Sequence, residues 1–317
     1  MTAFLIRRAL IALVVLILVS IIVFFSIRLI PGDVVKLMVQ DAQYVTPIDE
    51  AAIRHKLGLD VAIYVQYGRW ISGLLLHGDL GTSLYTNRPV SEQIFARLPV
   101  TLELSILGII VALLIALPIG IYSAIRQDSV SDYFFRSIAI LFITLPSFWI
   151  GTMVITLPSM WWHWTPPLTY VAFLTNPIEN LEQFIIPSVL LGMFLSGVTM
   201  RMTRTMMLEV LRQDYIRTAW SKGLQERVVI SRHALKNALI PVVTIIGNQI
   251  AGLLGGSVVL EKIFNLPGVG YLVLDTLSIR DYPLLSGINI VIAIFILIVN
   301  IIVDMTYSYL DPRIRFQ

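Results

Sequence analysis

Residues 9–27 read ALIALVVLILVSIIVFFSI, a run without a single charged side chain. An α-helix rises about 1.5 Å per residue, so about 20 apolar residues cross the hydrocarbon core of a bilayer. Arg7 and Arg8 precede the run, as they would in a signal peptide. The run is too long for an ordinary signal-peptide core, however, and Arg28–Asp33 offers no small-residue cleavage site. We therefore interpret it as a first membrane span that is retained.

Five further stretches of the chain have a comparable length and composition. Each must be helical, because lipid offers no water to satisfy the polar backbone groups within one segment. The third stretch is long enough to span with tilt, and the fourth has Pro187 in its first turn. The sequence thus predicts an all-α membrane protein, a single domain over 1–317 with about six transmembrane helices, at approximately 9–30, 100–122, 135–160, 184–203, 237–260 and 282–304.

Composition supports a membrane protein and excludes several other classes. Hydrophobic residues make up 57% of the chain and charged residues only 14%, more apolar surface than the core of a soluble protein of this size can hide. The net charge of +3 is too slight to suggest a nucleic-acid partner. There are no cysteines, which excludes disulfides, thiolate metal sites and thiol catalysis.

The distribution of basic residues predicts the orientation in the membrane. Of the 23 lysines and arginines, 14 lie near the two termini or in segments 123–136 and 201–236. On the other side, segment 158–183 has none and 261–281 has only two. Because basic residues concentrate on the cytoplasmic side, we expect a multi-pass protein of the cell (inner) membrane with both termini cytoplasmic. Trp161, Trp162 and Trp164 would then lie at the outer interface, which favours amphipathic rings.

Two outside regions are predicted. Region 31–98 contains a helix start at Thr46–Asp49 and apolar residues at helical spacing from Tyr64 to Leu75. It is either a helical cap packed on the bundle or a docking surface for another protein. The second region ends the fifth span with proline and glycines, and it is either a plain turn or an outer gate. The candidate gate residues are Phe264, Pro267, Gly268 and Gly270.

The most informative cytoplasmic segment is 213–224, QDYIRTAWSKGL, within a predicted loop at 204–236. Its pattern indicates a short amphipathic helix: Tyr215, Ile216, Ala219 and Trp220 share one face. Gly223 follows the last turn, where a left-handed cap residue is expected. Such a helix either rests on lipid headgroups or fits a groove on a soluble partner, and the residues alone do not choose between these.

The same cytoplasmic segment carries a resemblance to a known family. Residues 214–224 (DYIRTAWSKGL) with 232–241 (RHALKNALIP) closely resemble the cytoplasmic coupling signature of ABC importer permeases, in the version of the dipeptide, oligopeptide and nickel group. Segments 28–33, 78–83 and 264–270 are similar to the same group. The general signature opens with Glu-Ala-Ala where this chain has Arg217-Thr218-Ala219, and Pro241 falls further along than usual; both departures are typical of the peptide group.

The resemblance implies a type I importer permease fold and a complex of several chains. It would contain two permeases, two ABC ATPases and an extracytoplasmic substrate-binding protein, and the second permease would be a related but different chain. This chain would be non-catalytic and bind no cofactor, with ATP and magnesium held by the ATPases. Peptides, nickel chelates, glutathione and sugars all remain open as cargo. The two-faced pattern and the resemblance together predict ATPase-coupling residues Asp214, Tyr215, Arg217, Ala219, Lys222, Gly223 and Leu224.

Small residues in the fifth span form another candidate site. Several of them are four apart, so one stripe of the helix allows close approach of a neighbouring helix. The stripe either allows close packing against another helix or forms a smooth wall that faces the translocation path. Its members are Gly247, Ala251, Gly252, Gly255 and Gly256.

Other functions have less support. Glu103 and Asp304 lie near the ends of spans, and neither His163 nor His233 accompanies a nucleophile, a carboxylate pair or metal-ligand spacing. We therefore predict no catalytic or metal site. An ion-gradient-driven secondary transporter is the alternative, although the sequence has no acidic group deep in a span and no clear internal repeat.

Overall fold

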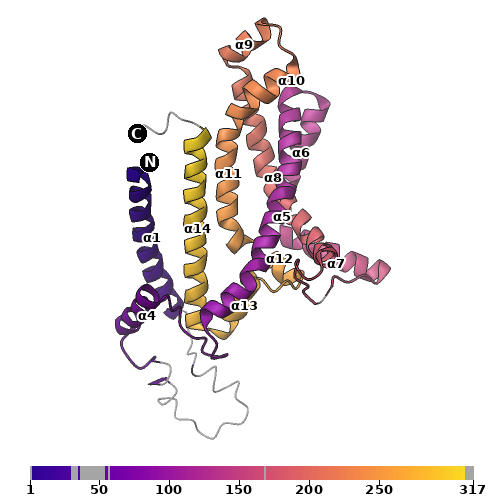
Figure 1. Cartoon of the computed structure of the whole chain (residues 1–317). Coiled ribbons are helices and arrows are strands. Elements are labelled where there is room, and N and C mark those ends of the chain that lie inside the picture. The colour runs from indigo at the N-terminus through magenta and orange to yellow at the C-terminus, as the bar shows by residue number, and fades with distance from the viewer. Residues whose placement is uncertain (1, 30–34, 36–53, 56–57, 168, 311–317) are drawn as a thin grey trace. The chain divides into compact units, whose positions relative to one another are not determined.

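The computed structural model describes residues 2–29, 35, 54–55, 58–167 and 169–310. Over these residues the regular structure is helical, and one isolated β-bridge joins Thr82 to Pro89. Figure 1 labels most of the elements. They are α1 (Thr2–Arg28), α4 (Ile63–His77), α5 (Val90–Ile125), α6 (Val130–Thr144), α7 (Ser147–Trp162), α8 (Pro177–Leu211), α9 (Asp214–Ser221), α10 (Glu226–Val228), the π-helical turn η1 (Val229–Ala234), α11 (Leu235–Gly256), α12 (Val258–Ile263), α13 (Val269–Ile279) and α14 (Tyr282–Leu310).

The helices confirm an all-α membrane protein. Five of those described are long and apolar enough to cross a bilayer, and a sixth span results if α6 and α7 are counted together. Much of their hydrophobic surface is exposed, as on Leu10, Val14 and Leu114, which suits contact with lipid or with another membrane subunit.

The third span differs from the prediction of one tilted helix over 135–160. Its two halves, α6 and α7, meet at an angle of 90°. The break falls at Leu145-Pro146, where both residues have extended backbone angles. Proline disfavours a helical conformation in the residue before it and donates no backbone hydrogen bond, so a helix ends there readily.

The fifth span and the loop before it also differ from the prediction. A continuous helix was expected over 237–260, whereas α11 ends at Gly256 and the short α12 follows Ser257. The predicted loop 204–236 is mostly helical: α8 continues to Leu211, and α10 and η1 lead into α11. Only short connections around α9 remain outside helices in this segment.

The predicted single domain contains two compact units. One unit holds residues 1–99 and 268–297, and the other holds 100–267 and 298–317. In the first unit, α4 packs on α1 through Phe24, whose ring centroid lies 5.3 Å from that of Tyr67 and 5.5 Å from that of Trp70. This contact favours the packed-cap interpretation of the outer region. The expected helix start at Thr46–Asp49 lies outside the described residues.

A second contact in the first unit fixes the segment after α4. The hydroxyl of Ser83 donates to the buried carboxylate of Asp281, which also accepts the backbone N–H of Leu284 in the first turn of α14. Asp281 thereby caps α14 and holds the 79–89 segment against it. Apolar packing among Leu80, Val90 and Ile288 supports the same junction.

The second unit is organised around α8, which packs against α6, α7 and α11. Its start is capped by Asn176, whose side chain accepts from Ile178 and Glu179, with Pro177 at the first position. Glycines allow α8 to approach its neighbours closely: a Cβ on Gly192 would lie 2.8 Å from the carbonyl oxygen of Gly108 in α5, and one on Gly197 would lie 2.8 Å from that of Ala139 in α6.

Candidate functional site

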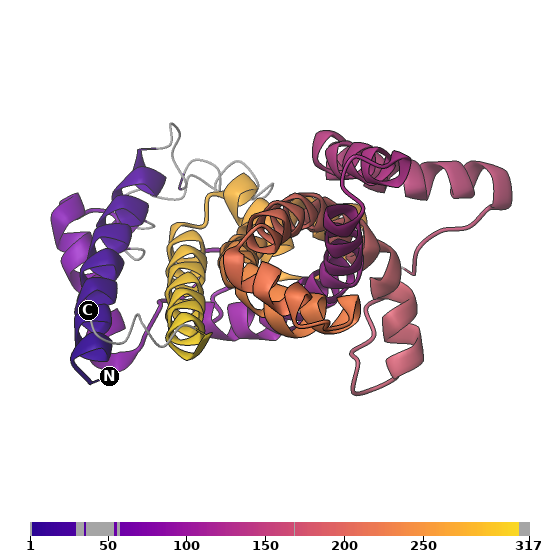
Figure 2. The same ribbon diagram turned by 90° about the horizontal axis from the view of Figure 1, so that it is seen from above.

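Helix α9 is seated at one end of α8 and α11 (Figures 1 and 2). Ile216 is fully buried and Ala219 nearly so. They belong to an apolar cluster that also contains Ala124 of α5, Met207 of α8, Val229 and Ala234 of η1, and Ala238 of α11. The hydroxyl of Tyr215 accepts a hydrogen bond of 2.8 Å from the side-chain amide of Asn237. One face of α9 is therefore fixed to the helices that continue into the bundle.

The rest of α9 is open. Tyr215 and Trp220 keep 43% and 44% of their surface exposed, and Leu224 is exposed at the end of the same segment. Six of the seven predicted coupling residues are exposed, and Ala219 is the exception. Ala219 packs inside the chain, so it can help to seat the helix but does not face a partner. The sequence pattern placed Trp220 only on the apolar face, yet it is the largest exposed ring on α9.

Gly223 has the left-handed backbone conformation that the sequence predicts for it, with φ of 73°. Nothing lies within 4 Å of where a Cβ would stand. The requirement for glycine at this position is therefore conformational, since the space around it is open.

The charged side chains of α9 are loosely held. Arg217 donates to Asp214 at 3.4 Å, and both side chains are largely exposed. An ion pair of this kind contributes little to stability, so both charges are available to another molecule.

A stronger ion pair lies close by and was not predicted from the sequence. Arg204 of α8 donates to both carboxylate oxygens of Asp132 in α6, at 2.8 Å from Nε and 2.6 Å from Nη2. Asp132 is fully buried and also accepts from the Ser123 hydroxyl and the Asp128 backbone N–H. The one sequence signal was Asp132 three residues after Ser129, the arrangement of a helix N-cap, which the structure contains.

The small residues of α11 fall into different environments. A Cβ on Gly247 would lie 2.2 Å from a methyl carbon of Val303 in α14, so Gly247 serves helix packing. Gly252 has nothing within 4 Å of a Cβ position and faces open space. Ala251 is half-buried, and the surroundings of Gly255 and Gly256 lie outside what the structure describes.

The candidate gate segment starts where helix α12 ends. Asn265 has a left-handed conformation with φ of 52°, and the N–H of Leu266 donates to the carbonyl of Glu261 at 2.8 Å. Phe264 is buried in the core of the second unit, to which Pro267 also belongs. Gly268 and Gly270 belong to the first unit and begin α13. The chain thus passes between its two units within this segment.

Glu261 is completely buried. Its carboxylate accepts from the hydroxyls of Thr101 and Ser257, each at 2.8 Å. The Glu261 carboxylate, which belongs to α12, thus links this helix to α5 and to Ser257 at the break between α11 and α12. Among the described residues, no cluster of three or more histidine, aspartate or glutamate side chains could hold a metal ion.

These helices define a multi-span membrane protein with an amphipathic helix docked at one end of its bundle. The model of the family "Binding-protein-dependent transport system inner membrane component" matches residues 116–316, and that of its N-terminal region matches residues 1–105. The chain belongs to this family, whose members are type I ABC importer permeases.

Several relatives align with the chain from end to end. The dipeptide transport system permease protein DppB of Alkalihalophilus pseudofirmus is 40% identical over 337 residues. The protein of the same name from Escherichia coli K12 is 37% identical over 340 residues. In both, all of this chain and all of the relative are aligned.

Proposed function

We propose that this chain is one permease subunit of an ATP-driven, binding-protein-dependent importer of dipeptides or oligopeptides. Membership of the permease family supports the transport role, and the relatives named as dipeptide permeases support the cargo. The chain forms half of the translocation pathway and catalyses no reaction itself. It binds no cofactor, and ATP with magnesium is held by two partner ATPases.

The proposed partners are a second, related permease, the two ATPases and an extracytoplasmic substrate-binding protein, with the bilayer around the permeases. Both termini and α9 face the cytoplasm, because the basic residues concentrate on that side. Segments 158–183 and 261–281 face outward. Gly252, with open space at its Cβ position, is the candidate for contact with the second permease or the pathway.

The observation that carries the proposal is the two-faced seating of α9. Its buried face is fixed to α8, η1 and α11, while Tyr215, Trp220 and Leu224 remain exposed. When a partner bound to the exposed face of α9 moves, α8, η1 and α11 must move with it. Packed elements shift between discrete arrangements and do not deform continuously. Closure of the ATPases would thereby reach the bundle.

The test uses the assembled importer in proteoliposomes, with uptake of a labelled dipeptide and ATP hydrolysis as readouts. Trp220→Ala removes an exposed ring at the proposed contact, where such residues commonly contribute about 2 kcal/mol. Association with the ATPases should weaken about thirtyfold, and uptake should fall with it. Tyr64→Ala, which removes an exposed ring from α4 in the other unit, is the matched control and should leave ATPase association intact.

Two results would contradict the proposal. One is unchanged ATPase association and uptake in the Trp220 variant. The other is uptake that proceeds without ATP when an ion gradient is imposed, which would favour a secondary transporter.

A further inference from the structure

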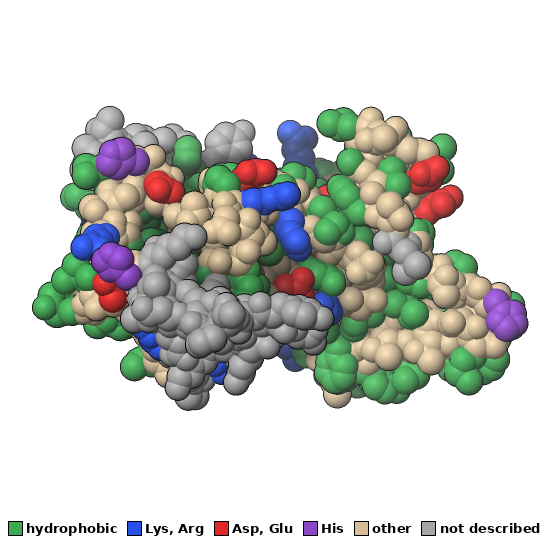
Figure 3. Space-filling view, turned by 90° about the horizontal axis from the view of Figure 1, so that it is seen from below, with side chains coloured by type: hydrophobic (Ala, Val, Ile, Leu, Met, Phe, Trp, Pro, Cys, Tyr) green, Lys and Arg blue, Asp and Glu red, His purple; other side chains and the backbone are tan. Residues whose placement is uncertain are grey.

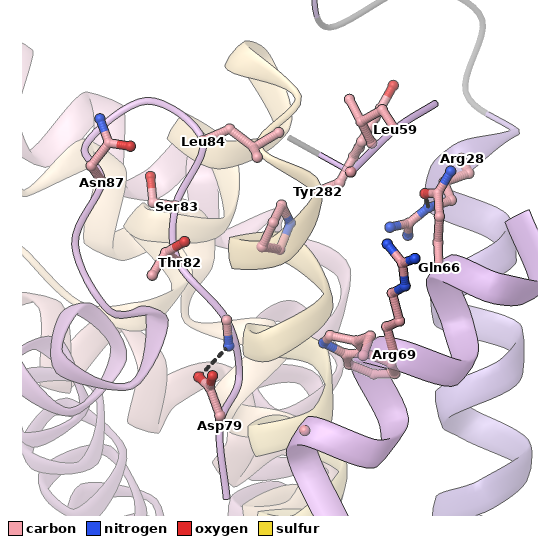
Figure 4. A pocket seen from close by; sticks show the side chains of 15 residues that line it. Arg28, Leu59, Gln66, Arg69, Asp79, Thr82, Ser83, Leu84, Asn87 and Tyr282 are labelled. Atoms are coloured by element: carbon pink, nitrogen blue, oxygen red, sulfur yellow. Dashed lines mark hydrogen bonds between the residues drawn. The ribbon is translucent and has the colours of Figure 1, made fainter. Parts of the chain in front are cut away.

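A cavity of about 400 Å³ lies within the first unit. Its wall comes from the end of α1, from α4, from the segment after α4 and from the start of α14. Figure 4 shows Arg28, Gln66 and Arg69 on one side of it, and Asp79 and Ser83 on the other. Figure 3 shows the molecule from below, with acidic and basic side chains both present among the hydrophobic ones.

The guanidinium of Arg28 is held in a fixed position. Nε donates to the side-chain oxygen of Gln66 and Nη1 donates to the carbonyl of Phe24, both at 3.2 Å. The group also stacks on the Phe24 ring, 3.4 Å from its centroid. Gln66 is fixed in turn, because its amide nitrogen donates to the carbonyl of Val61 at 2.9 Å. This side of the cavity therefore presents a guanidinium group whose position is fixed by the surrounding protein.

The positive charge on this wall is only partly compensated, since the carboxylate of Asp60 is near enough to Arg69 to feel its charge but makes no direct salt bridge with it. Arg28 and Arg69 line the same cavity, and within the described part of the chain neither forms an ion pair with a carboxylate. Two guanidinium groups beside one space favour an anion between them, and the partial burial of Arg28 strengthens that attraction. Their planar forks match the geometry of a carboxylate.

The opposite side carries one negative charge. Asp79 accepts the backbone N–H of Gly81 through one carboxylate oxygen at 2.8 Å, which orients the group. A cationic amine is the natural partner for such a carboxylate. The cavity therefore offers positive charge on one side and negative charge on the other, which complements a zwitterion. Its volume falls within the range usual for small-molecule sites.

We propose that this cavity binds a short peptide, with the terminal carboxylate on Arg28 and Arg69 and the ammonium group toward Asp79. The proposal deepens the proposed function, since it rests on a peptide cargo, and it gives the permease a peptide site of its own. Phosphate, free or in a lipid headgroup, is the other anion that two arginines could take.

The test measures binding of the dipeptide Ala-Ala to the purified full chain by isothermal titration, in nanodiscs made only of phosphatidylcholine. The amide of Ala-Ala, which lacks the terminal carboxylate, N-acetyl-Ala-Ala, which lacks the ammonium, and inorganic phosphate are titrated in parallel. Nanodiscs containing phosphatidylglycerol test for competition by an anionic headgroup.

The decisive variant is Arg69→Gln, because Arg69 is exposed and its replacement should not disturb folding. It should weaken Ala-Ala binding about tenfold or more, as expected for loss of a charged hydrogen bond. Arg28→Lys keeps the charge but not the fork and should also weaken binding. Arg88→Gln, an exposed arginine outside the cavity, should leave it unchanged. Asp79→Asn should weaken Ala-Ala but not N-acetyl-Ala-Ala.

The proposal is overturned if Ala-Ala does not bind, if its amide binds equally well, or if Arg69→Gln has no effect. Phosphate binding that exceeds dipeptide binding, or displacement of the dipeptide by phosphatidylglycerol, would instead assign the cavity to phosphate. If the wild-type importer takes up the dipeptide with ATP while the chain shows no Ala-Ala binding, the proposed cavity site is wrong but the proposed transport function stands. Loss of the proposed function would appear separately, as an absence of uptake by the wild-type importer.

Discussion

Gly223 ends α9 in a conformation that residues with a side chain rarely adopt. Gly223→Ala should cost about 1 kcal/mol, because a Cβ at positive φ meets the backbone. The loss should appear as roughly fivefold faster hydrogen exchange of the α9 amides, while Gly223→Asn should be milder.

The matched control for this prediction is Gly68→Ala in α4. A Cβ there also meets open space, but Gly68 has ordinary helical geometry. Alanine should slow exchange around it, since glycine is the poorer helix former. Equal effects of the two substitutions would show that the conformation at Gly223 does not matter.

Residue-scale predictions succeeded where the signal was local. The left-handed cap at Gly223 depends on the backbone of its own turn, and the sequence was sufficient to predict it. The burial of Ala219 depends on Met207 and Ala238, which come from two other helices. The pattern placed Ala219 on the apolar face but could not tell that its own chain, and not a partner, would cover that face.

At the scale of elements, the ion pair between Asp132 and Arg204 joins the first turn of α6 to α8. Asp132→Asn leaves the Arg204 guanidinium, 17% exposed, without its counter-ion. Breaking a buried pair in this way costs about 3–5 kcal/mol. The midpoint of thermal unfolding of the purified chain should therefore fall clearly.

The exposed pair Asp214–Arg217 provides the control for the buried one. Asp214→Asn should change the stability by about 0.5 kcal/mol or less, because water already screens both groups. The double variant Asp132→Asn with Arg204→Gln should recover part of the loss, since no charge is then left unpaired. If the single and double variants were equally stable, the pair would have no net role.

Helices were easier to predict than their interruptions. Apolar length is summed over a whole segment, so five of the predicted spans coincide with long apolar helices and the third coincides with the bent pair α6–α7. The break at Pro146 depends on one residue that membrane helices often tolerate, as the uninterrupted α8 does at Pro187. The break at Ser257 has still less sequence signal: its hydroxyl bonds to the buried Glu261, which in turn bonds to Thr101 of α5. That contact exists only in the folded chain.

At the scale of the whole molecule, the orientation in the membrane depends on whether the bent pair α6–α7 crosses the bilayer. Three positions of one unit decide it: Gln127 before α6, Leu174 between α7 and α8, and Lys222 after α9. The ion pair at Asp132–Arg204 places the start of α6 beside the last part of α8. Gly197, which precedes Arg204 in α8, approaches Ala139, which follows Asp132 in α6, so the two helices run antiparallel. Gln127 and Lys222 should therefore lie on the same side.

The chain has no cysteine, so each position can carry the only thiol in a single variant. In intact cells a membrane-impermeant maleimide should label Leu174→Cys, whose native side chain is 95% exposed. Gln127→Cys and Lys222→Cys should react only after the membrane is opened, because the basic residues keep their segments in the cytoplasm. Labelling of Gln127→Cys together with Leu174→Cys would make α6–α7 a re-entrant pair and leave five crossings. The two termini would then lie on opposite sides, and α9 could be cytoplasmic only if the N-terminus were not.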